Sequence, residues 1–434
     1  MISCVNLYRM TRVKKGIKDM KKISVLGLGY IGLPTACMLA NNGFEVLGVD
    51  VNKEIIDKLN CGKLHIEEPE LERIFLDAFK NKKIKISLKL EESDVFIIAV
   101  PTPLNHKKKA DLSFVVSAAD EISGKIKKGN VVILESTSPP GTTRNIVGKI
   151  ITNSTGLLAG KDYYLAFCPE RVLPGKIVYE LENNDRIVGG VDKKSAEITQ
   201  DIYKTFVKGK IFLTDLETSE FVKLAENTYR DVNIAFANEL SLICSDYGID
   251  VRQVIEYANM HPRVNILNPG PGVGGHCIAV DPWFILENTK RKDTLIEKSR
   301  NINDNMPFII SQRVAEIVSK YKKPKVTIFG FSYKENVGDT RESPAIVINN
   351  ELIKRKIKVS IYDPLAINTK YSLSGLEDSV NGSDIILLFA GHSVFKEIDL
   401  VLVYDLMRSR NIFDTRNFFD RTTVEKLGFN YYNI

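Results

Sequence analysis

The sequence lacks paired cysteine motifs and long apolar runs. Its six cysteines are scattered over 434 residues without CxxC spacing, which argues for a reducing compartment and against a disulfide framework or a zinc site. The longest apolar runs, such as residues 95–100 and 385–390, are far shorter than the roughly 20 residues that a membrane helix needs. We therefore expect a cytoplasmic protein that has no metal centre and does not insert into a membrane.

The sequence also has little excess of charge of one sign. It carries 60 basic and 54 acidic side chains, and residues 1–20 hold five of the basic and one of the acidic ones. The rest of the chain is therefore close to neutral, which is no footprint for nucleic acid. For residues 1–20 we expect a disordered basic tail, or a translation start that lies downstream at Met20.

A glycine motif follows the first strand pattern. Residues 22–26 read as a buried parallel strand, GLGYIG occupies residues 27–32, and residues 33–42 read as a helix. A second strand pattern, 44–49, ends at Asp50. Such glycines let a pyrophosphate reach the helix N-terminus, and the acid accepts hydrogen bonds from the ribose. The pattern predicts a Rossmann domain that binds NAD rather than NADP; the alternative for Asp50 is a turn residue.

Polar side chains follow the later strand patterns of this region. Thr102 follows one apolar strand, Thr137 and Thr143 follow the next, and Glu170 and Arg171 follow a third. In parallel sheets, ligands lie beyond the carboxyl ends of the strands. These side chains are therefore candidates for cofactor or substrate contacts. The alternatives are ordinary turn chemistry for the threonines and a surface salt bridge for Glu170.

One long helix is expected at residues 218–247, which contain no glycine or proline. Lys223, Asn227 and Arg230 stand at i, i+4 and i+7 and so share a helical face. Such a stripe is either solvated surface or a site where an amide between two cations holds an anion or an oxyanion. Apolar residues lie on more than one face of the helix, which suits a dimer interface.

A loop rich in glycine and proline, residues 268–276, leads to Cys277, and Asp281 follows four residues later. Glycines let a backbone approach a ligand closely, and successive N–H groups can hold a phosphate. A cysteine at the end of such a loop can become a reactive thiolate. The alternative is a surface turn followed by an inert, buried thiol.

Alternating strand and helix patterns return from residue 325, and the strand at residues 412–414 is expected to be the last. The first turn of this region has no GxGxxG motif, so we do not expect it to hold a second dinucleotide. Lys334 and Arg416 follow strands of this region. Cations at the carboxyl ends of strands suit a phosphate ligand.

Together these patterns predict an α/β protein in which a long central helical segment joins two doubly wound Rossmann-like domains. A chain of 434 residues is long enough for two or three domains. We expect the tail at residues 1–20, the NAD-binding domain at 21–210, the central dimerisation and catalytic segment at 211–305, and the C-terminal α/β domain at 306–434.

These motifs, taken in order, resemble the UDP-glucose/GDP-mannose dehydrogenase family from about Lys21 to the C-terminus. The motifs that carry the resemblance are GLGYIGLP with Asp50, EST at 135–137, CPER at 168–171, Lys223-x3-Asn227, GVGGHC with Asp281, GFSYKENVGDTRES at 330–343 and FDTR at 413–416. The segments CPERVLPGK and HPRVNILNPGPGVGGHCIAVDPWF are most similar to members that oxidise UDP-N-acetyl-D-mannosamine. Members that act on UDP-glucose usually have a lysine where this chain has Val280.

The resemblance implies an NAD-dependent, four-electron oxidation of the C6 alcohol of a nucleotide sugar to the carboxylate. The expected reaction converts UDP-N-acetyl-D-mannosamine to UDP-N-acetyl-D-mannosaminuronate, a precursor of polysaccharides or glycans. UDP-glucose, UDP-N-acetylglucosamine and GDP-mannose are the alternative substrates. The resemblance further implies a thiohemiacetal and then a thioester on Cys277, and a homodimer or higher homo-oligomer that forms through the central helix.

The resemblance also implies roles for the matching residues. Those expected in catalysis are Cys277, Lys223, Asn227, Asp281, Glu170 and Thr137. Those expected to bind NAD are Gly27, Gly29, Tyr30, Ile31, Gly32, Asp50, Thr102, Thr137, Thr143 and Arg341. Those expected to bind the nucleotide sugar are Arg171, Lys223, Asn227, Arg230, His261, Arg263, Gly274, Tyr333, Lys334 and Arg416.

Two other classes of protein remain as alternatives. A single-step dehydrogenase of the hydroxyacid type would share the Rossmann domain, the long helix and the Lys-x3-Asn pair, but would need no catalytic cysteine. A non-catalytic NAD-binding or scaffold protein would need none of these reactive side chains. The glycine loop that ends in Cys277 and the second α/β region disfavour the single-step dehydrogenase. The non-catalytic protein is disfavoured because Cys277, Lys223, Asn227 and Asp281 are all present.

Overall fold

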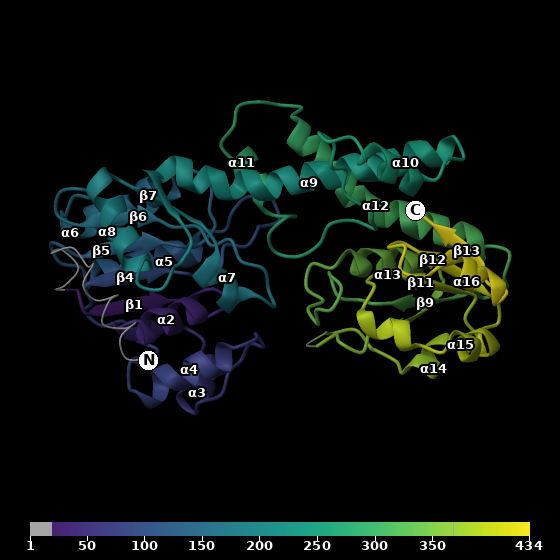
Figure 1. Ribbon diagram of the computed structural model, residues 1–434, viewed down its shortest axis with the longest axis horizontal. Coiled ribbons are helices and arrows are strands. Elements are labelled where there is room, and N and C mark those ends of the chain that lie inside the picture. Colours follow the sequence, from purple (N-terminus) through teal and green to yellow (C-terminus); the bar gives the residue numbers. More distant parts are fainter. Residues whose placement is uncertain (1–19, 368) are drawn as a thin grey trace. The chain divides into compact units, whose positions relative to one another are not determined.

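The computed structural model of the chain describes residues 20–367 and 369–434 (Figure 1). The basic tail expected at residues 1–20 therefore lies, apart from Met20, outside the described residues. Within the described part, no helix is both long enough and apolar enough to cross a membrane.

The chain divides into two compact units. The first comprises the chain up to Glu226 together with Trp283–Thr289, and the second comprises Asn227–Pro282 and Lys290–Ile434. The division falls within the 31-residue helix α9 (Leu216–Asp246), so this one helix contributes residues to both units. Each unit has its own sheet and its own core.

The first unit is built on an eight-stranded sheet of order β3-β2-β1-β4-β5-β6-β7-β8. Its strands are β1 (Lys22–Leu26), β2 (Glu45–Val49), β3 (Ile84–Ser87), β4 (Val95–Ile98), β5 (Val131–Leu134), β6 (Tyr164–Phe167), β7 (Arg186–Gly190) and β8 (Ile211–Asp215). Its helices are α2 (Gly32–Asn41), α3 (Lys53–Asn60), α4 (Leu71–Lys80), α5 (Ser113–Ser123), the π-helix η1 (Thr143–Gly148), α6 (Lys149–Thr155), α7 (Ile177–Asn183), α8 (Lys193–Tyr203) and most of α11 (Asp281–Leu286).

All neighbouring strands of this sheet are parallel except β6 and β7, which pair antiparallel. Alternate side chains of one strand enter two different cores. On β4, Ile97 belongs to one apolar cluster, and Phe96 and Ile98 belong to the other. Because both faces of the sheet are buried, the central strands are continuous apolar runs and helices cover both sides. The carboxyl ends of β1, β4 and β5 therefore meet at one edge, where the polar strand-end residues lie.

The second unit is built on a five-stranded, fully parallel sheet of order β10-β9-β11-β12-β13. Its strands are β9 (Lys325–Phe329), β10 (Lys358–Tyr362), β11 (Ile385–Leu388), β12 (Asn411–Asp414) and β13 (Asn430–Asn433). Its helices, besides the second part of α9, are α10 (Val251–Ala258), α12 (Leu295–Val318), α13 (Pro344–Lys354), α14 (Leu376–Val380), the 3-10 helix η2 (Ser393–Glu397), α15 (Leu400–Leu406) and α16 (Arg421–Lys426).

The predicted fold class, two doubly wound sheets with a long central helix, is confirmed, but one prediction about its end is wrong. The strand at residues 412–414 is not the last, because β13 follows and pairs with β12. Its sequence, Asn-Tyr-Tyr-Asn, is polar at both ends, so it lacks the apolar run that identifies a buried strand. A strand at the sheet edge does not need a continuous apolar run, and only Tyr431 of β13 is buried.

Candidate active site

The glycine motif after β1 has the shape that a dinucleotide needs. Gly27 has φ +93°, and a Cβ on it would lie 2.5 Å from the Ala99 carbonyl oxygen. A Cβ on Gly32 would lie 1.9 Å from the Gly27 oxygen, whereas a Cβ on Gly29 would meet nothing within 4 Å. The fold itself therefore requires the first and third glycines, and Gly29 leaves open the space in which a pyrophosphate can approach the backbone.

Asp50 lies at the end of β2, beside the glycine motif. One carboxylate oxygen accepts a hydrogen bond from the Leu28 N–H at 2.9 Å, and the other accepts from the Asn52 N–H at 2.8 Å. These bonds fix the orientation of a half-buried carboxylate, and each oxygen keeps a lone pair for a ribose hydroxyl. His65, which the sequence did not single out, lies close enough to Asp50 to feel its charge, although burial lowers the pKa of the imidazole.

The ends of β4 and β5 are joined by side-chain hydrogen bonds. The Thr102 hydroxyl donates to the Thr137 carbonyl at 2.5 Å, and the Ser136 hydroxyl donates to the Val100 carbonyl at 2.7 Å. Two of the predicted cofactor residues, Thr102 and Thr137, are thus brought together. Tyr30 and Ile31 lie in the glycine motif of the same unit, and Tyr30 is 43% exposed.

Thr143, a predicted cofactor residue, is bonded to a side chain of α9. Its N–H and its hydroxyl both donate to the carboxylate of Glu220, at 2.8 Å and 2.6 Å. The Gly141 N–H donates to the same carboxylate at 2.5 Å. The sequence analysis missed Glu220, although it stands three residues before Lys223 and seven before Asn227, a spacing that places all three on one helical face.

Glu170 forms a buried ion pair, so the alternative of a surface salt bridge is wrong. Its carboxylate lies 2.9 Å from the Arg186 guanidinium, and both side chains are less than a tenth exposed. The same guanidinium donates to the Cys168 sulfur at 3.6 Å. Glu135 accepts a hydrogen bond from the Tyr203 hydroxyl in this cluster. Burial, assisted by the charge of Glu170, raises the pKa of Glu135 to about 7.

Arg171, the neighbour of Glu170, points to a different element. Its guanidinium lies 3.1 Å from the carboxylate of Glu226 on α9, and both side chains are roughly one-third exposed. Its N–H donates to the Glu170 carboxylate at 2.7 Å. Arg171 is therefore held close to the turn of α9 that precedes Asn227, in a position that still reaches solvent.

In the second unit, three predicted catalytic residues come together. The Asn227 amide donates to the Asp281 carboxylate at 2.6 Å, and the Asp281 N–H donates to the Cys277 carbonyl at 2.9 Å. Asn227 is 8% exposed and Asp281 is 2% exposed, whereas Cys277 is exposed. The alternative that placed Cys277 as a buried thiol is therefore wrong, and its reactivity stays a prediction. Lys223 precedes Asn227 by one turn of the same helix, so it shares that helical face.

The glycine loop packs on the loop that follows β9. A Cβ on Gly274 would lie 2.6 Å from the Glu342 carbonyl oxygen, and a Cβ on Gly275 would lie 2.9 Å from the Tyr333 ring. Only glycines allow so close an approach, and Gly275 also has φ +84°. Tyr333 and Gly274, both predicted substrate residues, are thus neighbours.

Arg416 joins the same surroundings. Its Nε–H donates to the Phe389 carbonyl at 3.0 Å, and a Cβ on Gly270 would lie 2.7 Å from its guanidinium. Burial lowers its pKa, and the charge of Glu335 opposes this effect. Lys334 lies in the loop after β9 and is half-buried. Of the two cations predicted to bind phosphate, Arg416 therefore lies beside Gly270 of the glycine loop, and Lys334 follows Tyr333, which packs on Gly275.

The remaining predicted residues of this unit are more dispersed. Arg341 forms a close ion pair with Asp339 at 2.7 Å, and His276 lies 3.9 Å from the same carboxylate. The Arg263 N–H donates to the His261 ring at 3.3 Å. His261, Arg263 and Arg230 are exposed.

A buried polar network that the sequence analysis missed supports the glycine loop. Arg300, 1% exposed, lies 2.5 Å from Asp231, which also accepts a hydrogen bond from Asn303 at 2.8 Å. Asn303 in turn accepts from the Asn238 amide at 2.9 Å, and Asn238 accepts from the Gly270 N–H at 2.8 Å. The network therefore runs from α12 through α9 to the start of the glycine loop.

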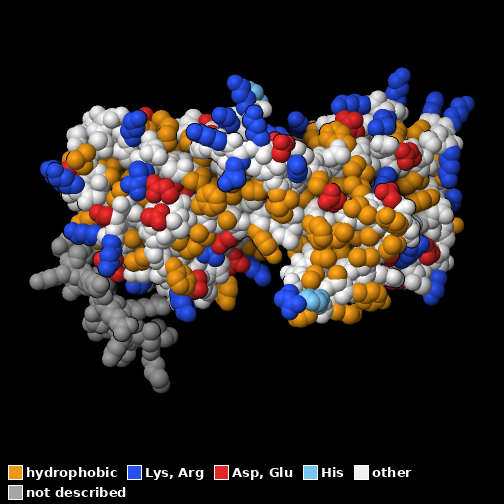
Figure 2. All heavy atoms as spheres, turned by 90° about the horizontal axis from the view of Figure 1, so that it is seen from above, with side chains coloured by type: hydrophobic (Ala, Val, Ile, Leu, Met, Phe, Trp, Pro, Cys, Tyr) orange, Lys and Arg blue, Asp and Glu red, His pale blue; other side chains and the backbone are white. Residues whose placement is uncertain are grey.

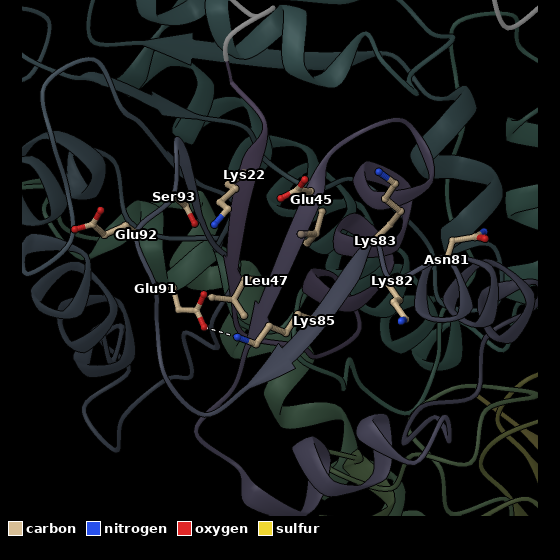
Figure 3. A pocket seen from close by; sticks show the side chains of 11 residues that line it. Lys22, Glu45, Leu47, Asn81, Lys82, Lys83, Lys85, Glu91, Glu92 and Ser93 are labelled. Carbon is tan, nitrogen blue, oxygen red and sulfur yellow. Dashed lines mark hydrogen bonds and ion pairs between the residues drawn. The ribbon is translucent and has the colours of Figure 1, made fainter.

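A pocket of about 280 Å³ lies elsewhere, at the amino ends of β1, β2 and β3 (Figure 3). Its rim carries charges of both signs, and Lys85 is paired with Glu91 at 2.5 Å. The glycine motif and Asp50 lie at the opposite, carboxyl ends of these strands. The pocket is therefore not the expected cofactor site.

Comparison with known protein families covers nearly the whole described chain. Residues 21–207 match the NAD binding domain of the UDP-glucose/GDP-mannose dehydrogenase family. Residues 217–305 match the central domain of this family, and residues 327–421 match its UDP binding domain. The first match confirms the prediction of NAD as the cofactor.

Individual relatives agree with the family models. The chain is 48% identical to a UDP-N-acetyl-D-mannosamine dehydrogenase of Methanococcus maripaludis, over 96% of this chain and 97% of the relative. It is 43% identical to an NDP-N-acetyl-D-galactosaminuronic acid dehydrogenase of Ralstonia nicotianae, over 92% and 96%. A UDP-D-ManNAc dehydrogenase structure from Pyrococcus horikoshii matches with a TM-score of 0.89 and 42% identity, over 95% and 99%. The chain belongs to the UDP-glucose/GDP-mannose dehydrogenase family, an assignment that its motifs predicted.

Proposed function

We propose that this protein oxidises UDP-N-acetyl-D-mannosamine to UDP-N-acetyl-D-mannosaminuronate, and that it does so in two steps through a covalent intermediate on Cys277. The observation that carries the proposal is the exposed thiol beside the buried pair of Asn227 and Asp281. In balance, one alcohol, one water and two NAD+ give one carboxylate, two NADH and three protons.

The cofactor is held by residues of the first unit. The pyrophosphate would lie in the open space at Gly29, and the Asp50 carboxylate would accept hydrogen bonds from the ribose hydroxyls. Thr102 and Thr137 would line the strand ends beyond them. The chemistry that NAD+ supplies when bound is acceptance of a hydride. The negative charge of Asp50 disfavours the additional phosphate of NADP+.

The first oxidation needs a group that steadies the alkoxide at C6. Lys223 and Asn227, one helical turn apart, perform this role. The Asn227 amide has two N–H groups, one of which is held by Asp281, so the second is available to an oxyanion. The aldehyde that results is attacked by the Cys277 thiolate, because a thiol with an ordinary pKa of about 8.5 ionises far more readily than an alcohol.

The second oxidation converts the thiohemiacetal to a thioester, which water then hydrolyses. Asp281 acts as a general base beside Cys277, and Glu170 with Thr137 activates the water that hydrolyses the thioester. Arg416 and Lys334 hold the diphosphate, with Arg171, Arg230, His261, Arg263, Gly274 and Tyr333 as further sugar and nucleotide contacts. Arg341 serves the cofactor.

The substrate assignment is supported by the relatives that act on UDP-N-acetyl-D-mannosamine. A second candidate, a nucleotide-linked N-acetylgalactosamine derivative, is favoured by the 43% identity to the Ralstonia enzyme. We expect NADH release to be fastest with UDP-N-acetyl-D-mannosamine in a screen that includes UDP-N-acetylgalactosamine, UDP-N-acetylglucosamine, UDP-glucose and GDP-mannose. A different sugar at the head of this ranking would replace the substrate assignment.

The covalent step is tested by replacing Cys277. Cys277→Ser and Cys277→Ala are expected to lose steady-state carboxylate formation by at least about 100-fold, because neither retains an accessible thiolate. The matched control is Cys61→Ser, which removes the exposed cysteine that caps α3 and is expected to be fully active. Sustained turnover of Cys277→Ala at two NADH per uronate would exclude the nucleophile and favour a non-covalent dehydrogenase.

We further propose that the chain forms a homodimer or higher homo-oligomer through α9. Large apolar side chains at Tyr229, Phe236 and Ile243 are exposed and recur every seven residues, so they form one stripe. Hydrophobic side chains are visible on the face that carries this helix (Figure 2). An exposed stripe of this kind indicates an interaction surface. Light scattering of Phe236→Glu is expected to show a smaller species than the parent protein.

A further inference from the structure

Glu220 is a buried carboxylate that the reaction outlined above does not use. It lies on the first turns of α9 and is 0% exposed. Its two oxygens accept three hydrogen bonds: from the Gly141 N–H at 2.5 Å, from the Thr143 N–H at 2.8 Å and from the Thr143 hydroxyl at 2.6 Å. Burial raises its pKa, and these donors oppose the shift. A buried carboxylate is costly unless it is bonded in this way.

The donors belong to the loop that joins β5 to η1. Within this loop the Thr137 carbonyl accepts a hydrogen bond from the Thr102 hydroxyl, and Thr143 is the first residue of η1. The loop therefore leaves the carboxyl end of a central strand, the edge at which a Rossmann sheet meets its cofactor. Gly141 has φ +91°, a conformation that turns its N–H towards Glu220. The loop is thus held from outside, by a side chain of α9, and not only by its own turns.

The same helix presents the group that acts on the substrate. Glu220 and Lys223 are three residues apart, and Asn227 follows four residues later, so the three lie on one face. One turn before Glu220, Glu217 pairs with Arg144 of η1 at 2.6 Å, but both of these side chains are about two-fifths exposed. The buried bonds of Glu220 therefore form the rigid link between the cofactor loop and the turn that carries Lys223, and the pair of Glu217 forms a weaker, solvated one.

We propose that Glu220 is a positioning residue that fixes the cofactor loop 137–143 against the turn of α9 bearing Lys223. The proposal rests on the proposed function, in which a hydride passes from the alcohol held by Lys223 to the cofactor. A displacement of about 1 Å between donor and acceptor is enough to slow such a transfer by roughly 100-fold. Glu220 sets that separation without touching either reactant. A purely structural role would instead lower stability alone.

The test compares Glu220→Gln with Glu217→Gln. The first replaces one acceptor oxygen by an NH2 group that faces an N–H donor, and the second removes only the exposed pair. We expect Glu220→Gln to slow the NADH burst in a single turnover by roughly 10- to 100-fold, with the KM for the nucleotide sugar changed less than about two-fold. The deuterium isotope effect at C6 should rise, because hydride transfer becomes the slow step. Glu217→Gln should behave like the parent protein.

Several results would overturn the proposal. One is a burst rate in Glu220→Gln equal to that of Glu217→Gln, and another is an unchanged isotope effect. A third is a fall in rate that is fully explained by a lower concentration of active sites, measured by active-site titration. Glu220→Asp keeps the charge and should recover part of the burst rate. If Glu220→Gln does not fold, Thr143→Val, which removes one of the three donors, should show the same changes to a smaller extent, and a parent-like burst would refute the link.

A substrate-independent measurement separates this proposal from the proposed function. If the parent protein releases no NADH from any nucleotide sugar, the proposed function fails. The loop can still be examined through NAD+ affinity, which should fall by roughly ten-fold in Glu220→Gln, and through amide exchange at Gly141 and Thr143, which should accelerate. Parent-like NAD+ affinity together with parent-like exchange would overturn the role of Glu220 whatever the substrate.

Discussion

The first turns of the two sheets begin alike and end differently. Gly27 follows β1 and Gly330 follows β9, both with positive φ, and a Cβ on either would collide with the backbone of a neighbouring strand, at Ala99 or Ala390. Both turns therefore need a glycine for the same steric reason. Only the first continues with two more glycines, and one of these, Gly29, would place a Cβ in open space.

The acids at the ends of the second strands diverge in the same way. Asp50 accepts one hydrogen bond on each oxygen and stays half-buried. Asp363 is 4% exposed. It accepts from the N–H groups of Phe331 and Ser332, from the Ser332 hydroxyl and from the His392 ring on one oxygen, and from two further N–H groups on the other.

The same strand-end acid therefore has two different environments in the two units. In the first unit each oxygen of Asp50 keeps a lone pair for a ligand. In the second unit both oxygens of Asp363 are occupied by bonds that brace the loop before Tyr333 and Lys334, so we expect cations to recognise a diphosphate there. His392 completes this brace, since its other nitrogen accepts the Asn336 N–H at 2.8 Å.

The largest effect is expected from the third glycine of the first turn. Gly32→Ala places a Cβ 1.9 Å from the Gly27 oxygen, so it should lower stability and weaken NAD+ binding by at least about 100-fold, because it displaces the helix N-terminus that holds the pyrophosphate. Gly29→Ala meets no protein atom within 4 Å. It should weaken NAD+ while leaving the melting temperature unchanged, and a fall in melting temperature equal to that of Gly32→Ala would contradict this distinction.

The sequence predicted the first turn well because its requirements are local. The glycines, the strand before them and Asp50 lie within 30 residues, and steric rules alone connect them. The roles of Glu220, Arg186 and His392 were not predictable in this way. Their partners lie many residues away, so only the folded chain brings each side chain to the loop that it holds.

The same limit explains two alternatives that the structure decided. Burial of the ion pair of Glu170 depends on Arg186 of β7, the strand that joins the sheet antiparallel. No periodicity in the sequence predicts that pairing. The exposed Cys277 follows a glycine loop that packs on Tyr333, a residue of the second sheet's first loop that lies far away in the sequence.

A second pair of substitutions contrasts the buried acids of the two units. Burial raises the pKa of Glu135 to about 7, so its contribution to stability is present below pH 4.5 and is lost as the pH rises through 7. Hydrogen bonds from His392 and from the loop overcome burial and lower the pKa of Asp363 to about 2, so its contribution is present above pH 4 and is lost as the pH falls through 2.

The free energy of unfolding of Glu135→Gln should therefore rise relative to that of the parent as the pH rises from 5 to 7, by up to roughly 3 kcal/mol. Asp363→Asn should be less stable than the parent at neutral pH, and this difference in stability should shrink only below about pH 4. Hydrogen exchange of core amides in each sheet, followed between pH 3 and 8, measures the two effects separately. Parallel pH profiles for the two variants would show that the acids do not differ as described.

The cations of the second unit are expected to have a smaller and selective effect. Lys334→Ala and Arg416→Ala each remove a charge near the loops around Cys277 and should raise the KM for the nucleotide sugar by roughly 10- to 30-fold, with the KM for NAD+ changed less than about two-fold. Lys358→Ala is the matched control, because Lys358 lies at the amino end of β10, whereas Lys334 and Arg416 follow the carboxyl ends of their strands. Equal changes in both KM values would show that neither cation is confined to the sugar nucleotide.

The smallest effect is expected from Asp50, the acid that remains open. Asp50→Ala removes a ribose acceptor and a negative charge together, so NAD+ affinity should fall by roughly ten-fold and NADP+ affinity should fall less or rise. Asp57→Asn removes a nearby exposed charge that is paired with Lys53 and controls for the general electrostatic change. Titration of each variant with both cofactors gives the ratio of the two dissociation constants. A ratio that stays the same in Asp50→Ala as in Asp57→Asn would mean that Asp50, like Asp363, serves only its own loop, and the contrast between the two acids would disappear.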